Sequence, residues 1–339
     1  MKYSISALLT AAVMSFTSLN VAASDITMTY ATPTHNNTHW AKTINLFSDY
    51  ASEYTDEKFD VSVSWGGAMG NDVQLIQKTQ LGSQVQAAVT SGAVISSTVP
   101  AFRVLDIPFL VEDADSLRAL FYPEGRLEGP VVDALQKNMH KKNLHLLSVF
   151  PTEFRGIMSS NAAIRSPKDV NGLKIRVTPS AVEREIMRSL GAGPTTMAVS
   201  EVFTAMQTGT VDGLAIPPIT STAFALGEVA GNFTMLDFQN HGSYTVVNKR
   251  FWESLPDEVR ENVQRATDQS IIDTLDIYET EFKTAIETLT SQGVDIYYPT
   301  REEKDEFKDI ILEKATKVAL ERLDADEIAF YEAIQAVLN

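Results

Sequence analysis

Two arginines follow strand-like segments and could bind an anion. Arg155 comes shortly after the apolar run LHLLSVF at 144–150, and Arg176 lies near the end of GLKIRV at 172–177, where every second residue is apolar. Ligands of open α/β sheets bind beyond the carboxyl ends of strands, and a guanidinium can form two parallel hydrogen bonds to a carboxylate. Arg155 and Arg176 are therefore candidates for an anion site, although a lone arginine is more often an exposed surface residue.

No motif for catalysis or metal binding accompanies these arginines. No glycine is followed by lysine, so the phosphate-binding P-loop is excluded, and neither HExxH nor G-x-S-x-G occurs. HNNTH places His35 and His39 four residues apart, but a helix cap at Asn36 or Asn37 would leave His35 outside the helix. We expect that the protein binds no metal and no cofactor and that it is not an enzyme. A secreted α/β hydrolase stays open as an alternative only through residues distant in sequence, and a ligand-sensing module of a receptor is a second alternative.

The elements that would position the arginines alternate between strand and helix in both halves of the chain. Alternating or continuous apolar runs predict nine strands, and Ser180 with Glu183 and Ser200 would begin two of the intervening helices. This rhythm is typical of an α/β fold with a mainly parallel sheet, repeated in two units. The predicted strands lie at 26–32, 60–65, 85–94, 103–110, 144–150, 155–160, 172–177, 195–199 and 211–217.

A long helical pattern follows these two units. Apolar residues recur at steps of three to five from Pro256 to Gln292, and neither glycine nor proline interrupts them after Pro256. A helix of this length would extend roughly 55 Å. Because a domain of this size is about 30–35 Å across, the helix should span both domains. The alternative is two helices with a break near Ser270. A final amphipathic helical region covers 302–338.

Composition limits the class of protein. The chain has 339 residues, which suggests two domains, and it contains no cysteine. Its formal net charge is −16, and it would be −17 if Lys2 were removed with the segment described next. Such a charge argues against nucleic acid or an anionic membrane as a partner, but it allows a small anionic ligand in a locally positive pocket.

Residues 1–23 are typical of a secretory signal peptide. Lys2 precedes an apolar run at about 5–16, and Val21-Ala22-Ala23 ends the segment with small residues suited to cleavage. A buried N-terminal helix is the alternative interpretation. No later segment approaches the ~18 apolar residues of a membrane span, so we expect no membrane insertion.

Several motifs together resemble the solute-binding (DctP-type) proteins of tripartite ATP-independent periplasmic (TRAP) transporters. This resemblance implies a two-domain periplasmic-binding-protein-like α/β fold, with two mixed sheets flanked by helices, a strand hinge and a long helix spanning both domains. It also implies that a ligand is held in the interdomain cleft. The motifs are SPKDVNGLKIRV (166–177), GAGPTTMAVSEVFTAMQTGTVDG (191–213), WGGAMGNDVQLIQKTQLG (65–82), VLDIPFL (104–110) and VVNKRFWESLPDEVR (246–260).

The resemblance also implies a ligand site. In most of the family the arginine matching Arg176 forms a salt bridge with the ligand carboxylate, and a second arginine near the position of Arg155 assists. Further ligand contacts are implied from the loop before the first helix, from the first domain and from the second domain. These residues are Thr34 and His35, Thr90 and Ser91, and Val199 and Ile216, respectively.

One segment departs from the family pattern. Many members that bind sugar acids or dicarboxylates have polar residues after VDG, whereas this chain has Leu-Ala-Ile-Pro-Pro at 214–218. Ile216 stands where a ligand-binding asparagine is often found. A hydroxyl-rich acid would lose a buried hydrogen-bond partner there, at a cost of ~1–3 kcal/mol. We therefore expect a smaller or less hydroxylated organic acid, with a C4-dicarboxylate among the possibilities.

The motifs and the composition together predict the domain boundaries, the location and the role of the protein. Domain I should comprise 24–152 with about 242–280, and domain II should comprise 153–241 with about 281–339. The protein should act in the periplasm, bind an organic acid anion and deliver it to the membrane subunits of a TRAP transporter.

Overall fold

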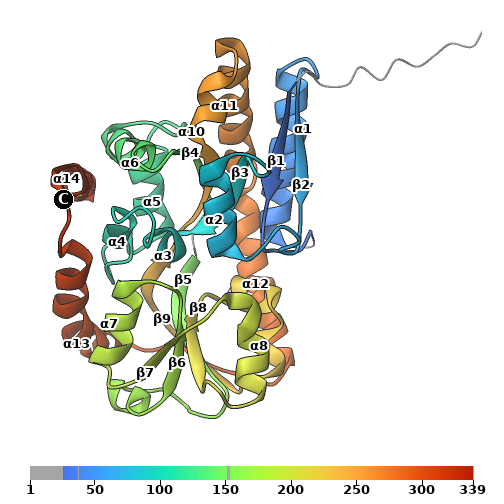
Figure 1. The fold of residues 1–339 in the computed structure, drawn as a ribbon. Coiled ribbons are helices and arrows are strands. Elements are labelled where there is room, and N and C mark those ends of the chain that lie inside the picture. Colours follow the sequence, from blue (N-terminus) through green and yellow to red (C-terminus); the bar gives the residue numbers. More distant parts are fainter. Residues whose placement is uncertain (1–25, 37, 151–152, 339) are drawn as a thin grey trace, which may run out of the picture.

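The computed structural model describes residues 26–36, 38–150 and 153–338. The expected signal peptide at 1–23 lies outside the described residues. Two mixed sheets, each flanked by helices, form an upper and a lower domain in Figure 1. We call the domain around the upper sheet the first domain and the other the second domain. The predicted fold class is confirmed.

The sheet of the first domain has the strand order β2-β1-β3-β10-β4. Strands β2, β1 and β3 are parallel, whereas β10 runs antiparallel to both β3 and β4. The late strand β10 thus sits between two early ones, so the chain must return to this sheet after building the second. The strands are β1 (Ile26–Ala31), β2 (Phe59–Ser64), β3 (Ala87–Ser91), β4 (Leu144–Val149) and β10 (Ser243–Asn248).

The sheet of the second domain has the order β11-β9-β5-β8-β6-β7. Strands β8, β6 and β7 are parallel, and β5 runs antiparallel to β8 and β9. The parallel strands end toward the first domain, which brings the ends of β6 and β8 to the boundary between domains. The strands are β5 (Glu153–Ser159), β6 (Lys174–Val177), β7 (Gly193–Thr196), β8 (Gly213–Ile216), β9 (Asn232–His241) and β11 (Asp295–Tyr297).

The helices cover both sheets. The early helices and α10 and α11 surround the first sheet, and α7, α8 and α12 surround the second (Figure 1). They are α1 (His39–Tyr54), α2 (Asp72–Leu81), α3 (Gly92–Ile95), α4 (Phe102–Leu105), α5 (Ala114–Phe121), α6 (Pro130–His140), α7 (Ala181–Ser189), α8 (Val199–Gln207), α9 (Pro218–Ala223), α10 (Lys249–Ser254), α11 (Asp257–Ile272), α12 (Leu275–Ser291), α13 (Arg301–Leu320) and α14 (Ala325–Leu338), with short 3₁₀ turns at Pro167–Val170 and Leu226–Glu228.

A single residue, Gly242, separates β9 of the second sheet from β10 of the first. A β-carbon at Gly242 would lie 2.4 Å from the hydroxyl oxygen of Tyr244, so this crossing requires glycine. The Gly242 carbonyl also accepts a hydrogen bond from the Gly92 amide at 3.1 Å. The passage between the domains is therefore fixed at this point by close packing and backbone hydrogen bonding.

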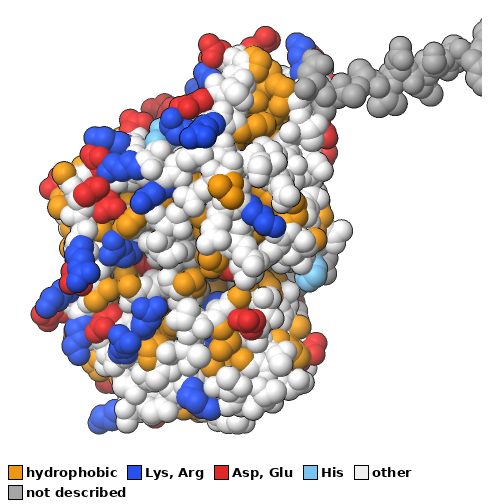
Figure 2. Space-filling view, in the orientation of Figure 1, with side chains coloured by type: hydrophobic (Ala, Val, Ile, Leu, Met, Phe, Trp, Pro, Cys, Tyr) orange, Lys and Arg blue, Asp and Glu red, His pale blue; other side chains and the backbone are white. Residues whose placement is uncertain are grey.

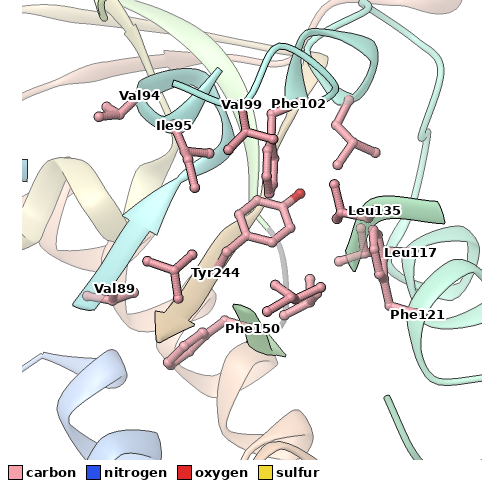
Figure 3. Packing of buried hydrophobic residues seen from close by; sticks show 14 of the residues in the cluster. Val89, Val94, Ile95, Val99, Phe102, Leu117, Phe121, Leu135, Phe150 and Tyr244 are labelled. Carbon is pink, nitrogen blue, oxygen red and sulfur yellow. The ribbon is translucent and has the colours of Figure 1, made fainter. Parts of the chain in front are cut away.

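Tyr244 occupies the centre of the first domain's core. Figure 3 shows its ring surrounded by aliphatic and aromatic side chains from β3, α3 and the helices beyond, and it meets Phe102 edge-on at 4.8 Å between centroids. Val89 and Val94 belong to the same cluster. The core therefore supports the segment β3–α3 that faces the second domain.

Two predicted strands in the first domain differ from the structure. The strand predicted at 85–94 ends at Ser91, whose hydroxyl accepts a hydrogen bond from the Val94 amide and begins α3. The segment 103–110 is not a strand but contains α4 and the turns after it. Val104, Leu105 and Ile107 are buried, and Phe109 and Leu110 are partly buried. A continuous apolar run does not distinguish a strand from a buried helical segment.

The long helix is interrupted between Ile272 and Leu275, so the alternative of two helices applies. The hydroxyls of Thr267, Ser270 and Thr274 each donate to a carbonyl three or four residues earlier. Such bonds compete with the helical backbone ladder and bend helices. The two helices still span both domains together, because α11 packs on α1 and α12 packs on α9.

The final helical region is also two helices, and they pack on different domains. α13 lies against α7, whereas α14 lies against α5 and α6 of the first domain (Figure 1). Lys141, the C-cap residue of α6, forms ion pairs with Asp324 at 2.9 Å and Asp326 at 2.8 Å. The expected grouping of 281–339 with the second domain therefore differs from the position of α14.

The helix Val199–Gln207 begins one residue before the predicted cap Ser200, with Ala198 at its N-cap.

Candidate functional site

A pocket lies between the two domains and is lined by both. It encloses about 550 Å³, part of it open to solvent. The ends of β6 and β8 and the start of α8 line it from the second domain, and β3, α3, α1 and α2 line it from the first. The lining residues are Pro33, Trp40, Asp72, Val89, Thr90, Ser91, Val94, Arg155, Arg176, Thr178, Val199, Ile216, Thr220, Phe224, His241 and Ser243.

Arg176 presents a free edge of its guanidinium to this pocket. The side chain is only 2% exposed, and its Nε and Nη2 donate to the Met197 carbonyl at 3.1 and 2.9 Å. Nη1 has no hydrogen-bond partner among the described residues. Burial lowers the pKa of Arg176 to about 10, against the opposing effect of Glu183, so the group remains charged at neutral pH. An anion in the pocket can therefore pair with a fixed and desolvated cation.

Arg155 is held much more completely. Its Nη1 donates to the Ala215 carbonyl at 2.9 Å, and Nη2 lies 2.7 Å from His241 Nδ1 and 3.2 Å from Glu183 Oε1. Because arginine can only donate, His241 Nδ1 must be an acceptor, which places the ring proton of neutral His241 on Nε2. The Arg155–Glu183 ion pair is buried, with side chains 2% and 1% exposed. Arg155 therefore faces the pocket with its charge balanced by Glu183.

Glu183 connects this ion pair to the boundary between the domains. Its Oε2 accepts from the Thr178 amide at 2.8 Å, and its own amide donates to Ser180 Oγ at 3.3 Å. Ser180 Oγ donates in turn to Asp106 Oδ2 of the first domain at 2.8 Å. Burial raises the pKa of Asp106 to about 8, and the charge of Glu183 adds to the rise. The predicted helix start at Ser180 is correct, but the Glu183 carboxylate bonds to Thr178 rather than back to Ser180.

Asp72 and Thr178 are polar pocket residues that the sequence reasoning missed. Asp72 is the first residue of α2, and burial raises its pKa while the charge of Arg176 opposes the shift. The hydroxyl of Thr178 is buried and has no hydrogen-bond partner among the described residues. Thr178 follows Arg176 by two residues, a spacing that places both on one side of an extended chain and could have marked it.

The structure brings six of the eight predicted site residues together. Arg176, Arg155, Thr90, Ser91, Val199 and Ile216 all line the pocket. Thr34 and His35 do not: Thr34 is buried and bonds to the Thr32 hydroxyl at 2.8 Å, and His35 is exposed. Pro33 contributes instead, because the loop continues to Thr38, the observed N-cap of α1, rather than capping at Asn36 or Asn37.

Charged side chains outside the pocket are mixed in sign. Figure 2 shows lysines and arginines gathered over α7 and α13 with acidic side chains among them. Within the described residues, no group of three or more His, Cys, Asp or Glu could hold a metal ion. No helix in that part of the chain is long and apolar enough to cross a membrane. The cations that face the pocket are thus buried arginines rather than part of a basic surface.

Comparison with known proteins gives consistent matches over most of the chain. A family model described as bacterial extracellular solute-binding protein, family 7 (DctP) matches residues 30–321. The C4-dicarboxylate-binding periplasmic protein DctP of Rhodobacter capsulatus is 29% identical over 291 residues, covering 86% of this chain and 85% of its own. The 2,3-diketo-L-gulonate-binding periplasmic protein YiaO of Escherichia coli is 24% identical over 255 residues, or 75% of each chain.

A solved structure shows the same fold. The TRAP periplasmic solute-binding protein from Desulfovibrio salexigens with bound orotic acid has a TM-score of 0.85 at 20% identity, covering 92% of this chain and 99% of that chain. Together with the family match over residues 30–321, these findings confirm the resemblance seen in the motifs. The chain belongs to family 7 of the bacterial extracellular solute-binding proteins, the solute-binding proteins of TRAP transporters.

Proposed function

We propose that this protein captures an organic acid anion in the interdomain pocket through a salt bridge from Arg176. The observation that carries the proposal is a buried, charged guanidinium that lines the pocket and whose Nη1 has no partner in residues 26–36, 38–150 and 153–338. Ionised carboxylates form strong, short hydrogen bonds with guanidinium groups. In a site shielded from water this pairing is stronger than at the surface.

The ligands named for related proteins support a carboxylate. They include C4-dicarboxylate, 2,3-diketo-L-gulonate and, in the solved structure, orotic acid, all of which carry a carboxylate. Ile216 lines the pocket and lacks any hydrogen-bonding group. The proposed ligand is therefore a small organic acid with few hydroxyl groups.

Capture would be coupled to delivery. The pocket is lined by both domains, so ligand binding favours the closed arrangement over one in which the domains are apart. In the proposed role the protein acts in the periplasm and presents the closed, loaded form to TRAP membrane subunits. Uptake of the identified ligand by cells that express those subunits with and without this protein would test the delivery step.

The binding step is tested by identifying the ligand. Mass spectrometry of small molecules released from the purified protein, followed by a thermal-shift screen of organic acids, should yield a carboxylate that stabilises the wild type. Arg176→Met should lose this stabilisation. Lys174→Met changes an exposed cation on the same strand and should keep it. Equal stabilisation of wild type and Arg176→Met would refute the proposed salt bridge.

A further inference from the structure

We infer that the pocket is built for a monocarboxylate with an apolar body, rather than for a dicarboxylate or a sugar acid. This inference rests on the proposed carboxylate binding by Arg176. It comes from three features of the pocket: one available cation, one uncommitted hydroxyl beside it, and apolar side chains around the remaining space.

Only one of the two pocket arginines is available to a ligand. Nη1 of Arg176 has no partner in the described part of the chain, whereas Arg155 gives both terminal nitrogens to protein acceptors and is neutralised by Glu183. The Nε of Arg155 has no hydrogen-bond partner among the described residues, but it belongs to a guanidinium whose charge Glu183 already balances. A second carboxylate would therefore lose its hydration without gaining an unpaired cation, which is unfavourable in a buried site.

Asp72 opposes a second negative charge as well. Its side chain lines the same pocket from the first domain, where it interacts electrostatically with Arg176. When it is ionised, Asp72 would repel a second carboxylate placed on that side. Charge balance across the two domains thus fits a ligand with one negative group.

Thr178 supplies a second donor for that one group. Its hydroxyl is buried without a partner among the described residues, and Thr178 lines the pocket two residues after Arg176. Buried hydroxyls normally have a hydrogen-bond partner, so an unpartnered hydroxyl at a pocket wall needs a ligand acceptor. We assign the carboxylate to Arg176 Nη1 and Thr178 Oγ1.

Most hydroxyls in the rest of the pocket are already bonded within the protein, and Asp72 and His241 are its other polar lining groups. The Thr220 hydroxyl donates to Glu153 at 2.6 Å, and Thr90 and Ser91 bond to backbone groups at 3.3 and 3.4 Å. Apolar side chains from both domains surround the remaining space. These are Trp40, Val89 and Val94 from the first domain, and Val199, Ile216 and Phe224 from the second. An alkyl or aryl body would bury its surface against them, whereas each unpaired hydroxyl would be penalised.

A calorimetric comparison of probes tests the inference. Butyrate, isovalerate, benzoate and phenylacetate form an apolar monocarboxylate series. Succinate has a second carboxylate in place of the terminal methyl of butyrate, and glucuronate adds hydroxyls. At least one member of the series should bind at least tenfold more tightly than succinate and glucuronate, and Arg176→Met should abolish its binding. Tighter Arg176-dependent binding of succinate or glucuronate would overturn the inference while leaving the proposed function intact. Binding of organic acids that does not depend on Arg176 would overturn both, whereas absence of binding by every probe would overturn the inference alone.

Thr178 variants test the assigned position of the carboxylate. Thr178→Val keeps the shape and removes the hydroxyl, and it should weaken the best monocarboxylate about 10- to 100-fold. Thr178→Ser keeps the hydroxyl and should stay within a few-fold of wild type. Thr196→Val, at an exposed position on the neighbouring strand β7, is a matched control and should have no effect. Unchanged affinity in Thr178→Val would contradict the assignment.

Discussion

Removing the charge of Glu183 should destabilise the protein strongly, even though Glu183 was recognisable in the sequence only as a helix-capping residue. Glu183→Gln retains the size of the side chain and an oxygen that can accept from the Thr178 amide. It removes only the negative charge that balances Arg155. The substitution therefore separates the contribution of the ion pair from that of the hydrogen bond to the Thr178 amide.

The expected magnitude follows from burial. The two side chains are 2% and 1% exposed and their charged atoms lie 3.2 Å apart. Removing one partner of such a buried pair costs about 3–5 kcal/mol, because the other charge is left without compensation. Glu183→Ala should cost roughly 1–3 kcal/mol more, since the buried Thr178 amide then loses its acceptor as well.

Denaturant unfolding followed by circular dichroism measures both variants. We expect the free energy of unfolding to fall in the order wild type, Glu183→Gln, Glu183→Ala. Lys249→Met, which breaks an exposed ion pair with Glu253, should change it by less than about 1 kcal/mol and serves as the control. A loss of less than about 1 kcal/mol in Glu183→Gln would refute the reasoning that the buried ion pair fixes Arg155.

Two further predictions concern stability. The pKa of Asp106 is raised to about 8 by burial and by Glu183, so its proton stabilises the folded state fully below about pH 4, and this contribution is lost as the pH rises toward 8. Asp106→Asn should flatten that decline, which is at most about 1.4 kcal/mol per pH unit for one proton. The free energy of unfolding measured from pH 5 to pH 9 tests this, and an unchanged slope would contradict the raised pKa of Asp106. Gly213→Ala would place a β-carbon 2.3 Å from the Met158 carbonyl oxygen and should cost about 1–3 kcal/mol or more in denaturant unfolding. Gly193→Ala, whose added carbon would meet nothing closer than 3.9 Å, should be nearly neutral, and equal effects of the two would contradict the packing argument.

The sequence was most informative where a local pattern has one structural meaning. Alternation in GLKIRV predicts a strand that ends near Arg176, and the end of a parallel strand in such a fold faces the ligand. The motif context then selected Arg176 from many surface cations. What alternation could not show is that both faces of β6 are buried from Ile175 to Val177, so that Arg176 is a buried cation whereas Lys174 is exposed.

The remaining errors arose where distant contacts decide local structure. The run at 103–110 is apolar because the fold buries most of it, not because it is a strand. The break after Ile272 coincides with hydrogen bonds from side-chain hydroxyls to the helix backbone, such as the bond from Thr274 to the Ser270 carbonyl. Serine and threonine also fit within a continuous helical pattern, so the pattern did not reveal the break. Likewise, the start of α1 decides which loop residue lines the pocket, and in the structure that residue is Pro33. Helix starts inferred from sequence are uncertain by a residue or two.

The most direct test of the central claim is the affinity of Arg176→Met for the acid released from the wild-type protein, measured by isothermal titration calorimetry. Methionine nearly matches the volume of the arginine stem and removes the charge, so the folded state can be verified by circular dichroism before titration. The account predicts a loss of affinity of about 30-fold or more, because a buried partner of the ligand carboxylate is removed. A folded Arg176→Met protein that binds the acid with wild-type affinity would contradict it.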